Sequence, residues 1–250
     1  MVLAAGFGRR LRPLTDRVPK PLLLVGGAPL IAYPLALLRE AGIHEVLINL
    51  HHLGAQIRDA LGDGSAYGVS ISYSEEDPIL DTGGAIAKAR PFLGGGTFAV
   101  LNSDTVMDLG LADVITTHRR RGALATMVLR PDRDAARYGI IEVDPEQRIR
   151  RFLGQPAQVP GPLEPLMFAG VHVFEPEVFD FMEEGRFGIN RKTYPAMLAA
   201  GRPLFGHRFD GYWRVLDTHA GLAEGRWEFE RDELLAPSRR LRATAAFELS

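Results

Sequence analysis

LAAGFGRRLRPLT occupies residues 3–15, and the tripeptide PKP closes this stretch at residues 19–21. The apolar residues at its start predict a short strand at Met1–Ala4, so the glycines fall directly after a strand. A glycine at such a point lets backbone N–H groups approach a phosphate chain with no Cβ in the way. The stretch therefore predicts a loop that binds the phosphates of a nucleotide.

Four cations follow the glycines: Arg9, Arg10, Arg12 and Lys20. Guanidinium and ammonium groups can hold a triphosphate and a phosphomonoester, which repel each other, within reacting distance. Taken singly, Arg9 and Arg12 are better explained as solvated loop residues, whereas the place of Arg10 and Lys20 in the glycine and proline frame favours phosphate binding. The glycine spacing matches neither the lysine-threonine phosphate loop nor the dinucleotide fingerprint.

Composition points to an ordinary globular protein with a small-molecule partner. The 250 residues are 46% hydrophobic and 24% charged, with a net charge of -2 and a pI near 6.4. This balance gives no overall attraction to nucleic acid or to an anionic membrane, so we expect neither as a partner. The absence of cysteine excludes a disulfide framework, a thiolate nucleophile and a cysteine zinc site. No apolar run approaches the ~20 residues of a membrane span, and we expect an untargeted cytoplasmic protein.

Short β-rich runs alternate with amphipathic helical stretches in the first half of the chain. This rhythm predicts an α/β fold, a three-layer α/β/α sandwich with a mainly parallel, Rossmann-like sheet and ligands at the carboxyl ends of its strands. The predicted strands are Met1–Ala4, Glu45–Leu50, Val69–Tyr73, Thr97–Leu101 and Leu124–Leu129, and the predicted helices are Leu30–Ala41, Leu53–Leu61, Gly84–Phe92 and Leu111–Arg121.

After Pro131 the pattern changes to a small lobe. Tyr138–Val143 and Arg148–Phe152 predict a β-hairpin, followed by a proline- and glycine-rich connection over residues 154–165. Further along, the sequence predicts strands at Met167–Phe174, Leu204–Phe209 and Tyr212–Leu216, helices at Pro176–Met182 and Thr193–Ala200, and a last helix capped by Thr218 and running to about Leu235.

Leu3–Pro21 resembles the signature of the sugar-phosphate nucleotidyltransferase family, L-A-A-G-x-G-x-R-L-x-P-L-T followed by P-K-P. The similarity extends to about Glu230 and is closest to the short members that use N-acetylmuramate 1-phosphate or mannose 1-phosphate. It implies that a nucleoside triphosphate, with UTP or GTP favoured, and a sugar 1-phosphate give an NDP-sugar and pyrophosphate. It also implies a nucleotide-binding half at 1–130, a sugar-binding half at 131–235 and a tail at 236–250, in a monomer or homodimer.

The resemblance assigns roles to the residues of the signature. Arg10 would stabilise the departing pyrophosphate, and Lys20 would hold the phosphates at the reacting centre. Asp104, in the polar cluster that ends a predicted strand, would hold the cofactor Mg²⁺, which takes oxygen ligands. The alternative for Asp104 is the cap of the helix expected at Leu111, for which Asp108 is better placed. The implied nucleotide contacts are Leu3, Ala4, Ala5, Gly6, Phe7, Gly8, Arg9, Thr82, Gly83, Gly84 and Asn102.

Thr82-Gly83-Gly84 resembles the family turn that opens a helix and lies against the nucleobase. The other interpretation is a tight helix start capped by Asp81 or Thr82, and both can hold at once. The implied sugar contacts are Tyr138, Gly139, Glu142 and Gly170. His172 stands in an apolar strand and is better explained as a core histidine than as a catalyst.

Two stretches depart from the family pattern. Gly154-Gln155-Pro156 stands where the family has E-K-P, and Phe168 replaces an asparagine that meets sugar hydroxyls. Val215 stands at the position of the second metal carboxylate and cannot bind Mg²⁺. Asp217, two residues on, would restore the same face of a strand and could be the second metal ligand, or it could cap the following helix.

These departures keep two other functions open. One is a nucleotide- or NDP-sugar-binding homologue that has lost activity and regulates a partner. The other is a cytidylyltransferase that uses a non-sugar phosphate such as phosphocholine. A dinucleotide oxidoreductase is disfavoured, because the strand at Glu45–Leu50 ends in Asn49 rather than in a ribose-binding acid.

Overall fold

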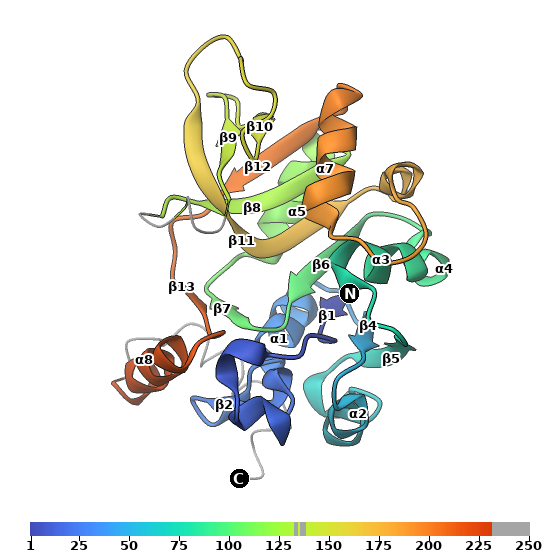
Figure 1. The fold of residues 1–250 in the computed structure, drawn as a ribbon, viewed down its shortest axis with the longest axis vertical. Coiled ribbons are helices and arrows are strands. Elements are labelled where there is room, and N and C mark those ends of the chain that lie inside the picture. Colours follow the sequence, from blue (N-terminus) through green and yellow to red (C-terminus); the bar gives the residue numbers. More distant parts are fainter. Residues whose placement is uncertain (133–134, 136–138, 232–250) are drawn as a thin grey trace. The chain divides into compact units, whose positions relative to one another are not determined.

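A computed structural model describes residues 1–132, 135 and 139–231 of the chain (Figure 1). The chain forms two compact units. The first comprises Met1–Ile79, Leu101–Ala112 and the described residues from Gly211 onward, and the second comprises Leu80–Val100 and Asp113–Asp210. The chain therefore leaves the first unit and returns to it twice.

The first unit is built on a parallel sheet. Strand β1 lies between β4 and the last two residues of β6, since Val2 aligns with both Ile48 and Leu101. Strand β5 extends the sheet beyond β4 in the same direction. The carboxyl ends of parallel strands meet at one edge, so the residues that follow these strands gather there. The bounds are β1 Val2–Leu3, α1 Ala32–Glu40, β4 Glu45–Leu50, α2 Gly54–Leu61, β5 Ser70–Glu75 and β6 Phe98–Asn102.

Smaller elements complete the first unit. Strand β7 pairs antiparallel with β13, which the chain reaches only on its last return, and helix α8 follows. Thr218 caps α8 as predicted, because its Oγ1 accepts a hydrogen bond of 3.1 Å from the N–H of Gly221. These elements are β2 Leu24–Val25, β3 Ala28–Pro29, β7 Thr105–Met107, β13 Trp213–Val215 and α8 His219–Glu230, with 3-10 turns at Arg9–Leu11, Leu14–Asp16, Lys20–Leu22 and Ser65–Tyr67.

The second unit has a mixed sheet. Strand β11 pairs antiparallel with both β8 and β9, β12 runs parallel to β8, and β10 closes a hairpin with β9. The bounds are α3 Asp81–Lys88, α4 Arg90–Leu93, α5 Leu111–Arg120, β8 Ala125–Arg130, β9 Ile141–Val143, β10 Ile149–Phe152, β11 Glu164–Phe174, a 3-10 helix at Pro176–Phe181, α7 Ile189–Ala199 and β12 Leu204–Arg208.

Helices α5 and α7 cover opposite faces of this mixed sheet. His118 of α5 makes a 2.8 Å hydrogen bond with Thr126 of β8, and Thr126 aligns with Val173 of β11. The neighbouring residue of β11, His172, bonds instead to Tyr194 of α7. Because successive strand residues point to opposite faces, the second unit has three layers (Figure 1).

The predicted α/β class and the Rossmann-like parallel sheet are confirmed, with differences of detail. Strand β11 begins at Glu164, within the stretch expected to be a connection, because its first residues pair with β9. The helix expected over Gly84–Phe92 is divided into α3 and α4 at Ala89, because Pro91 has no N–H to continue the hydrogen bonds of α3 and is accepted in the first turn of α4. Helix α7 begins at Ile189 rather than at Thr193, and β7 was not predicted.

Candidate active site

A buried polar chain fixes the point where the glycine loop leaves β1. The N–H of Ala4 donates to Oδ1 of Asn49 over 2.8 Å, and Nδ2 of Asn49 donates to Oε1 of Glu76 over 2.7 Å. Asn49 and Glu76 are each only 4% exposed, so these bonds are shielded from water. Sequence reasoning gave neither residue a role, although an amide at the end of an apolar strand was a usable signal.

Gly6 and Gly8 of the loop have different structural roles. Gly8 has a φ of +60°, and Oγ1 of Thr15 donates to its carbonyl over 2.9 Å. A Cβ added to Gly8 would lie 2.8 Å from Cγ2 of Thr15, whereas one added to Gly6 would meet no atom within 4 Å. Gly8 is therefore required by the turn, and Gly6 faces open space, as a close approach to a ligand requires.

Aromatic rings pack together at the glycine loop. The ring centroid of Phe7 lies 5.2 Å from that of His51 and 5.3 Å from that of His52. The exposed guanidinium of Arg9 lies 5.2 Å from the centroid of Phe7. Asn102, the last residue of β6, aligns with Leu3 of β1, so it stands at the edge from which the loop departs.

Lys20 and Asp104 form an ion pair although 84 residues separate them. Nζ of Lys20 lies 2.5 Å from Oδ2 of Asp104, and the two side chains are 12% and 25% exposed. Oγ1 of Thr105 donates to the other carboxylate oxygen over 3.2 Å. Asp104 therefore sits between β6 and β7 with Lys20 as its partner, which excludes the capping role considered for it.

Arg10 and Asp217 form a second ion pair in the first unit. Nη1 of Arg10 lies 2.7 Å from Oδ2 of Asp217. The Asp217 side chain is 10% exposed, whereas that of Arg10 is 62% exposed and reaches the carboxylate from the solvent side. Thr218 occupies the N-cap of α8, so the interpretation of Asp217 as the cap is wrong.

The two carboxylates belong to adjoining segments. Val215 of β13 aligns with Thr105 of β7, and the N–H of Leu216 donates to the carbonyl of Asp104 over 2.9 Å. One backbone bond thus ties the residue before Asp217 to Asp104 itself. We call these two ion pairs, Lys20 with Asp104 and Arg10 with Asp217, the charge cluster.

The charge cluster has the oxygen donors that Mg²⁺ prefers. Among the described residues, no three or more histidine, aspartate or glutamate side chains form a metal-binding group. Mg²⁺ bound with substrate phosphates needs only one or two protein carboxylates, so Asp104 and Asp217 fit it. Each carboxylate is paired with one cation through its Oδ2 atom, and among the described residues Oδ1 of Asp104 meets only the Thr105 hydroxyl.

In the second unit, the Thr82-Gly83-Gly84 turn is held by its own packing. The N–H groups of Gly83 and Gly84 both donate to the carbonyl of Phe187, over 2.9 and 3.2 Å. A Cβ on Gly84 would lie 2.1 Å from the carbonyl oxygen of Gly185, and one on Gly83 would lie 2.2 Å from the Phe187 ring. These glycines permit that contact, and their amides are already bonded.

The N-terminus of α3 is not capped by a side chain as considered from the sequence. Leu80 occupies the N-cap position, and no side chain there accepts a capping hydrogen bond. Asp81, with a φ of +62°, accepts from the N–H of Thr82 over 2.7 Å. Oγ1 of Thr82 accepts from the N–H of Ile189, and this bond ties the turn to the start of α7.

The expected sugar residues Gly139 and Glu142 line one hollow of about 400 Å³, which we call the acceptor hollow. Both carboxylate oxygens of Glu142 accept from Nη1 of Arg151, over 2.9 and 3.0 Å. Leu153 and Gly154 also line this hollow, so the departure from E-K-P falls on its wall. Tyr138 lies outside the described residues.

Gly170 is placed differently from the other expected sugar residues. It is buried in β11 with a φ of +101°, at the irregularity in register between Phe168 and His172. His172 is 2% exposed, and burial lowers its pKa to about 3. The ring of Phe168 stacks on that of His172 with centroids 4.2 Å apart, so His172 is a core histidine as expected.

The described residues contain no helix of the length and apolarity that a membrane crossing requires. The first unit brings together the glycine loop, Arg10, Lys20, Asn102, Asp104 and Asp217, and the second unit holds Thr82, Gly83, Gly84, Gly139, Glu142 and Gly170. A Rossmann-like α/β protein with a glycine loop at the carboxyl edge of its sheet is the class that this arrangement defines.

Comparison with known proteins identifies the family within this class. The model of the nucleotidyl transferase family matches residues 1–229, and the chain belongs to that family. It is 39% identical over 231 residues to N-acetylmuramate alpha-1-phosphate uridylyltransferase of Neisseria meningitidis serogroup B, covering 90% of this chain and 95% of that protein. It is 34% identical to mannose-1-phosphate guanylyltransferase of Mycobacterium tuberculosis, covering 97% of this chain and 67% of that protein.

Solved structures share the fold. A putative glucose-1-phosphate thymidylyltransferase from Bacillus anthracis, in complex with a sucrose, superposes with a TM-score of 0.78 over 94% of each chain, at 22% identity. HddC from Yersinia pseudotuberculosis superposes with a TM-score of 0.75, over 91% of this chain and 97% of that one, at 19% identity.

Proposed function

We propose that this protein is an enzyme that transfers a nucleotidyl group from a nucleoside triphosphate to a sugar 1-phosphate, giving an NDP-sugar and pyrophosphate. The charge cluster carries the proposal, because it places two cations and two carboxylates beside a glycine loop that opens toward a ligand. Membership of the nucleotidyl transferase family supports it. The reaction would take place in the cytoplasm, where nucleoside triphosphates are made.

The proposed reaction is an in-line displacement. An oxygen of the sugar phosphate attacks the α-phosphorus, the bond from that phosphorus to the bridging oxygen breaks, and pyrophosphate leaves with the electron pair. The attacking phosphate is already ionised near neutral pH, so no general base is required. Catalysis rests on positioning and on neutralising charge, as is usual in phosphoryl chemistry.

Each residue of the charge cluster has a place in this reaction. Asp104 and Asp217 would hold Mg²⁺, which when bound supplies positive charge to the phosphates. Lys20 would leave Asp104 to bind the phosphates at the reacting centre, and Arg10 would leave Asp217 to stabilise the departing pyrophosphate. Exchange of an internal carboxylate for a substrate phosphate keeps every charge paired before and after binding.

The acceptor hollow supports a sugar as part of the second substrate. Glu142, held by Arg151, presents carboxylate oxygens beside the hollow that can accept bonds from hydroxyl groups. Similarity to a uridylyltransferase for N-acetylmuramate 1-phosphate and to a guanylyltransferase for mannose 1-phosphate favours UTP or GTP with one of these two acceptors. Whether the protein acts as a monomer or a homodimer stays a prediction.

The test is pyrophosphate release, measured with Mg²⁺ for every pairing of UTP, GTP, CTP and dTTP with four acceptors: N-acetylmuramate, mannose and glucose 1-phosphates, and phosphocholine. We expect turnover to be highest for one sugar 1-phosphate with UTP or GTP, and to be lost with EDTA. Nucleotide binding with no turnover in any pairing would favour the inactive regulatory homologue that Val215 and Gly154-Gln155 suggest. Turnover only with CTP and phosphocholine would favour the non-sugar acceptor.

A further inference from the structure

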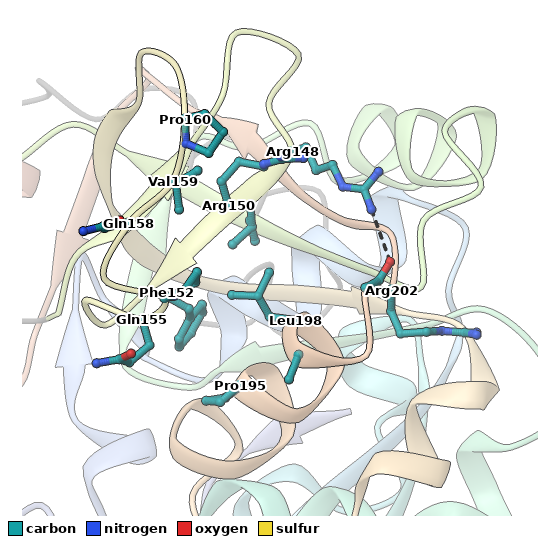
Figure 2. Close-up of a pocket in the computed structure, with 14 residues that line it drawn as sticks. Arg148, Arg150, Phe152, Gln155, Gln158, Val159, Pro160, Pro195, Leu198 and Arg202 are labelled. Atoms are coloured by element: carbon teal, nitrogen blue, oxygen red, sulfur yellow. Dashed lines mark hydrogen bonds between the residues drawn. The ribbon is translucent and has the colours of Figure 1, made fainter.

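The second unit has another hollow, of about 610 Å³, on the side of the hairpin that faces α7 (Figure 2). This volume lies in the range of small-molecule sites, roughly 300–1,000 Å³. We call it the arginine hollow, and no residue expected from the sequence to bind substrate lines it. The residues around it are Arg148, Ile149, Arg150, Phe152, Gln155, Pro156, Gln158, Val159, Pro160, Pro195, Leu198, Ala199, Gly201 and Arg202.

The walls of the arginine hollow combine positive charge with apolar surface. Three of its described lining residues are arginines and none is acidic. Nη2 of Arg148 donates to the carbonyl of Gly201 over 3.3 Å, as Figure 2 shows, and Nε of Arg150 lies 3.8 Å from Asp144. The guanidinium of Arg202 lies 5.9 Å from the centroid of the Phe181 ring, and Figure 2 shows it pointing away from the hollow. Because a guanidinium has five N–H donors, the contacts of Arg148 and Arg150 leave donors for a ligand. Such a lining selects an anion, and phosphate is the anion that arginine binds with two parallel hydrogen bonds.

An apolar floor accompanies the charges. Phe152, Pro195 and Leu198 line the hollow between the arginines, and Figure 2 shows them between β10 and α7. The Phe152 ring stacks on Tyr194 of α7, with centroids 5.1 Å apart, and this contact makes the floor rigid. An inorganic ion would not cover this surface. Phe152 is already only 1% exposed, so a ring attached to a phosphate would bury the half-buried Pro195 and Leu198 beside it.

The arginine hollow and the acceptor hollow share one segment of chain. Arg151 reaches Glu142 on the acceptor side, whereas its neighbours Arg150 and Phe152 line the arginine hollow. Leu153 and Gly154 line the acceptor hollow, and the next two residues, Gln155 and Pro156, line the arginine hollow. A ligand that moves this segment therefore changes the wall of both.

We propose that the arginine hollow binds a small organic phosphate with an aromatic or apolar ring, and that its occupant changes the affinity of the acceptor hollow through residues 153–156. The second part of this inference rests on the proposed function. A nucleoside monophosphate and a phosphorylated sugar both have the required chemistry, and the apolar floor favours the nucleobase.

Calorimetric titration of the full chain with phenyl phosphate tests the binding. We expect binding that is at least about tenfold tighter than that of inorganic phosphate, and a loss of about tenfold or more in the double variant Arg148→Gln/Arg150→Gln. The variant Lys20→Ala should lose affinity for UTP or GTP and keep phenyl phosphate binding. Absence of binding, or binding that depends on Lys20 rather than on the arginines, would overturn the proposal. UMP and glucose 6-phosphate, titrated in the same way, distinguish the two natural sources.

Steady-state kinetics test the coupling. With phenyl phosphate present, we expect the KM for the sugar 1-phosphate to change by about threefold or more and the KM for the triphosphate to stay constant. The double variant should have the basal rate and show no response. Binding by calorimetry without a change in KM would overturn the coupling alone. Because calorimetry needs no turnover, failure of the proposed function would not be mistaken for failure of the binding site.

Discussion

The charge cluster and the acceptor hollow differ in how closely they follow the family signature. The glycine loop carries the signature unchanged from Leu3 to Pro21, and its Arg10 and Lys20 each meet a carboxylate from a distant part of the chain. At the acceptor hollow, the E-K-P triplet of the family is absent. Glu142 lines this hollow and is paired with Arg151 of the same hairpin. In the proposed reaction, the donor side would thus consist of long-range pairs around the glycine loop, and the acceptor side of neighbours on one hairpin.

The difference has a chemical reason. Every nucleoside triphosphate presents the same phosphates and metal, so the side that binds them needs the same charges whatever the sugar. Acceptors differ in their hydroxyl groups and substituents, and a hairpin can change its side chains without disturbing the sheet. We infer that residues of the first unit carry out the reaction and that residues of the second unit determine which acceptor is used.

The largest effect is expected for Lys20→Ala. Loss of the cation at the reacting centre should lower kcat/KM for pyrophosphate release by about 10³-fold, as removal of one preorganised charge contact does in other enzymes. The matched control is Arg12→Ala, since Arg12 pairs only at the exposed surface with Asp16 over 3.0 Å. The control should stay within about twofold. A loss of less than about tenfold in Lys20→Ala would contradict the assigned role.

Asp217→Asn tests whether the second metal carboxylate has moved. We expect kcat to fall about 10²-fold and the Mg²⁺ concentration for half-maximal rate to rise, because one oxygen ligand loses its charge. Val215 is the last residue of β13 and lies two residues before Asp217, so Val215→Asp in the Asp217→Asn background would return a carboxylate to the family position and should restore part of the rate. Full activity of the single variant would show that Asp217 is only the partner of Arg10.

These two sites show what could be predicted from the sequence. The glycine loop and the strands β1, β4 and β6 were predictable, because local spacing and apolar runs determine them. Asp217 was identified as a candidate, but its partner was not, since an ion pair between residues 10 and 217 depends on the return of the chain in β13. The hydrogen bond between Asn49 and Glu76 was missed for the same reason, because the two side chains meet only once β4 and β5 are paired.

In the second unit, strand pairing overrides what the local sequence predicts. The hairpin was predicted within a few residues, but β11 was expected to begin at Met167 because Pro165 and the glycines before it suggested a connection. Pairing with β9 outweighs that local preference. The arginine hollow could not be predicted, because it forms between β10 and α7, and its arginines are ordinary surface residues in the sequence.

Gly84→Ala separates packing from ligand contact in the Thr82-Gly83-Gly84 turn. A methyl group there would lie 2.1 Å from the carbonyl oxygen of Gly185. We therefore expect the free energy of unfolding, measured with urea, to fall by about 2 kcal/mol. Gly95→Ala is the control, because a methyl group at Gly95 meets no atom within 4 Å. An unchanged stability with weaker nucleotide binding would show that Gly84 serves the nucleobase alone.

Glu142→Gln sharpens the contrast between donor and acceptor sides. Loss of the charge should weaken a bond to a sugar hydroxyl and release Arg151, so the KM for the sugar 1-phosphate should rise about tenfold. The KM for the triphosphate should not change. Glu183→Gln, which breaks an exposed pair with Lys192, is the control and should alter neither constant. An equal rise in both KM values would place Glu142 outside the acceptor site.

The smallest effect is expected at His172, in the core of the second unit. Burial lowers the pKa of His172 from its ordinary 6.5 to about 3, so between these values the unfolded chain binds a proton that the folded chain does not. Stability should therefore fall as the pH drops below 6.5, with a slope from this residue of up to about 1.4 kcal/mol per pH unit. Burial also lowers the pKa of His118, which adds a slope of the same sign. Urea unfolding of His172→Gln between pH 6 and pH 4.5 should show a shallower slope than the unchanged chain, whereas the exposed His44→Gln should not. Equal slopes in all three would mean that His172 takes up its proton without unfolding.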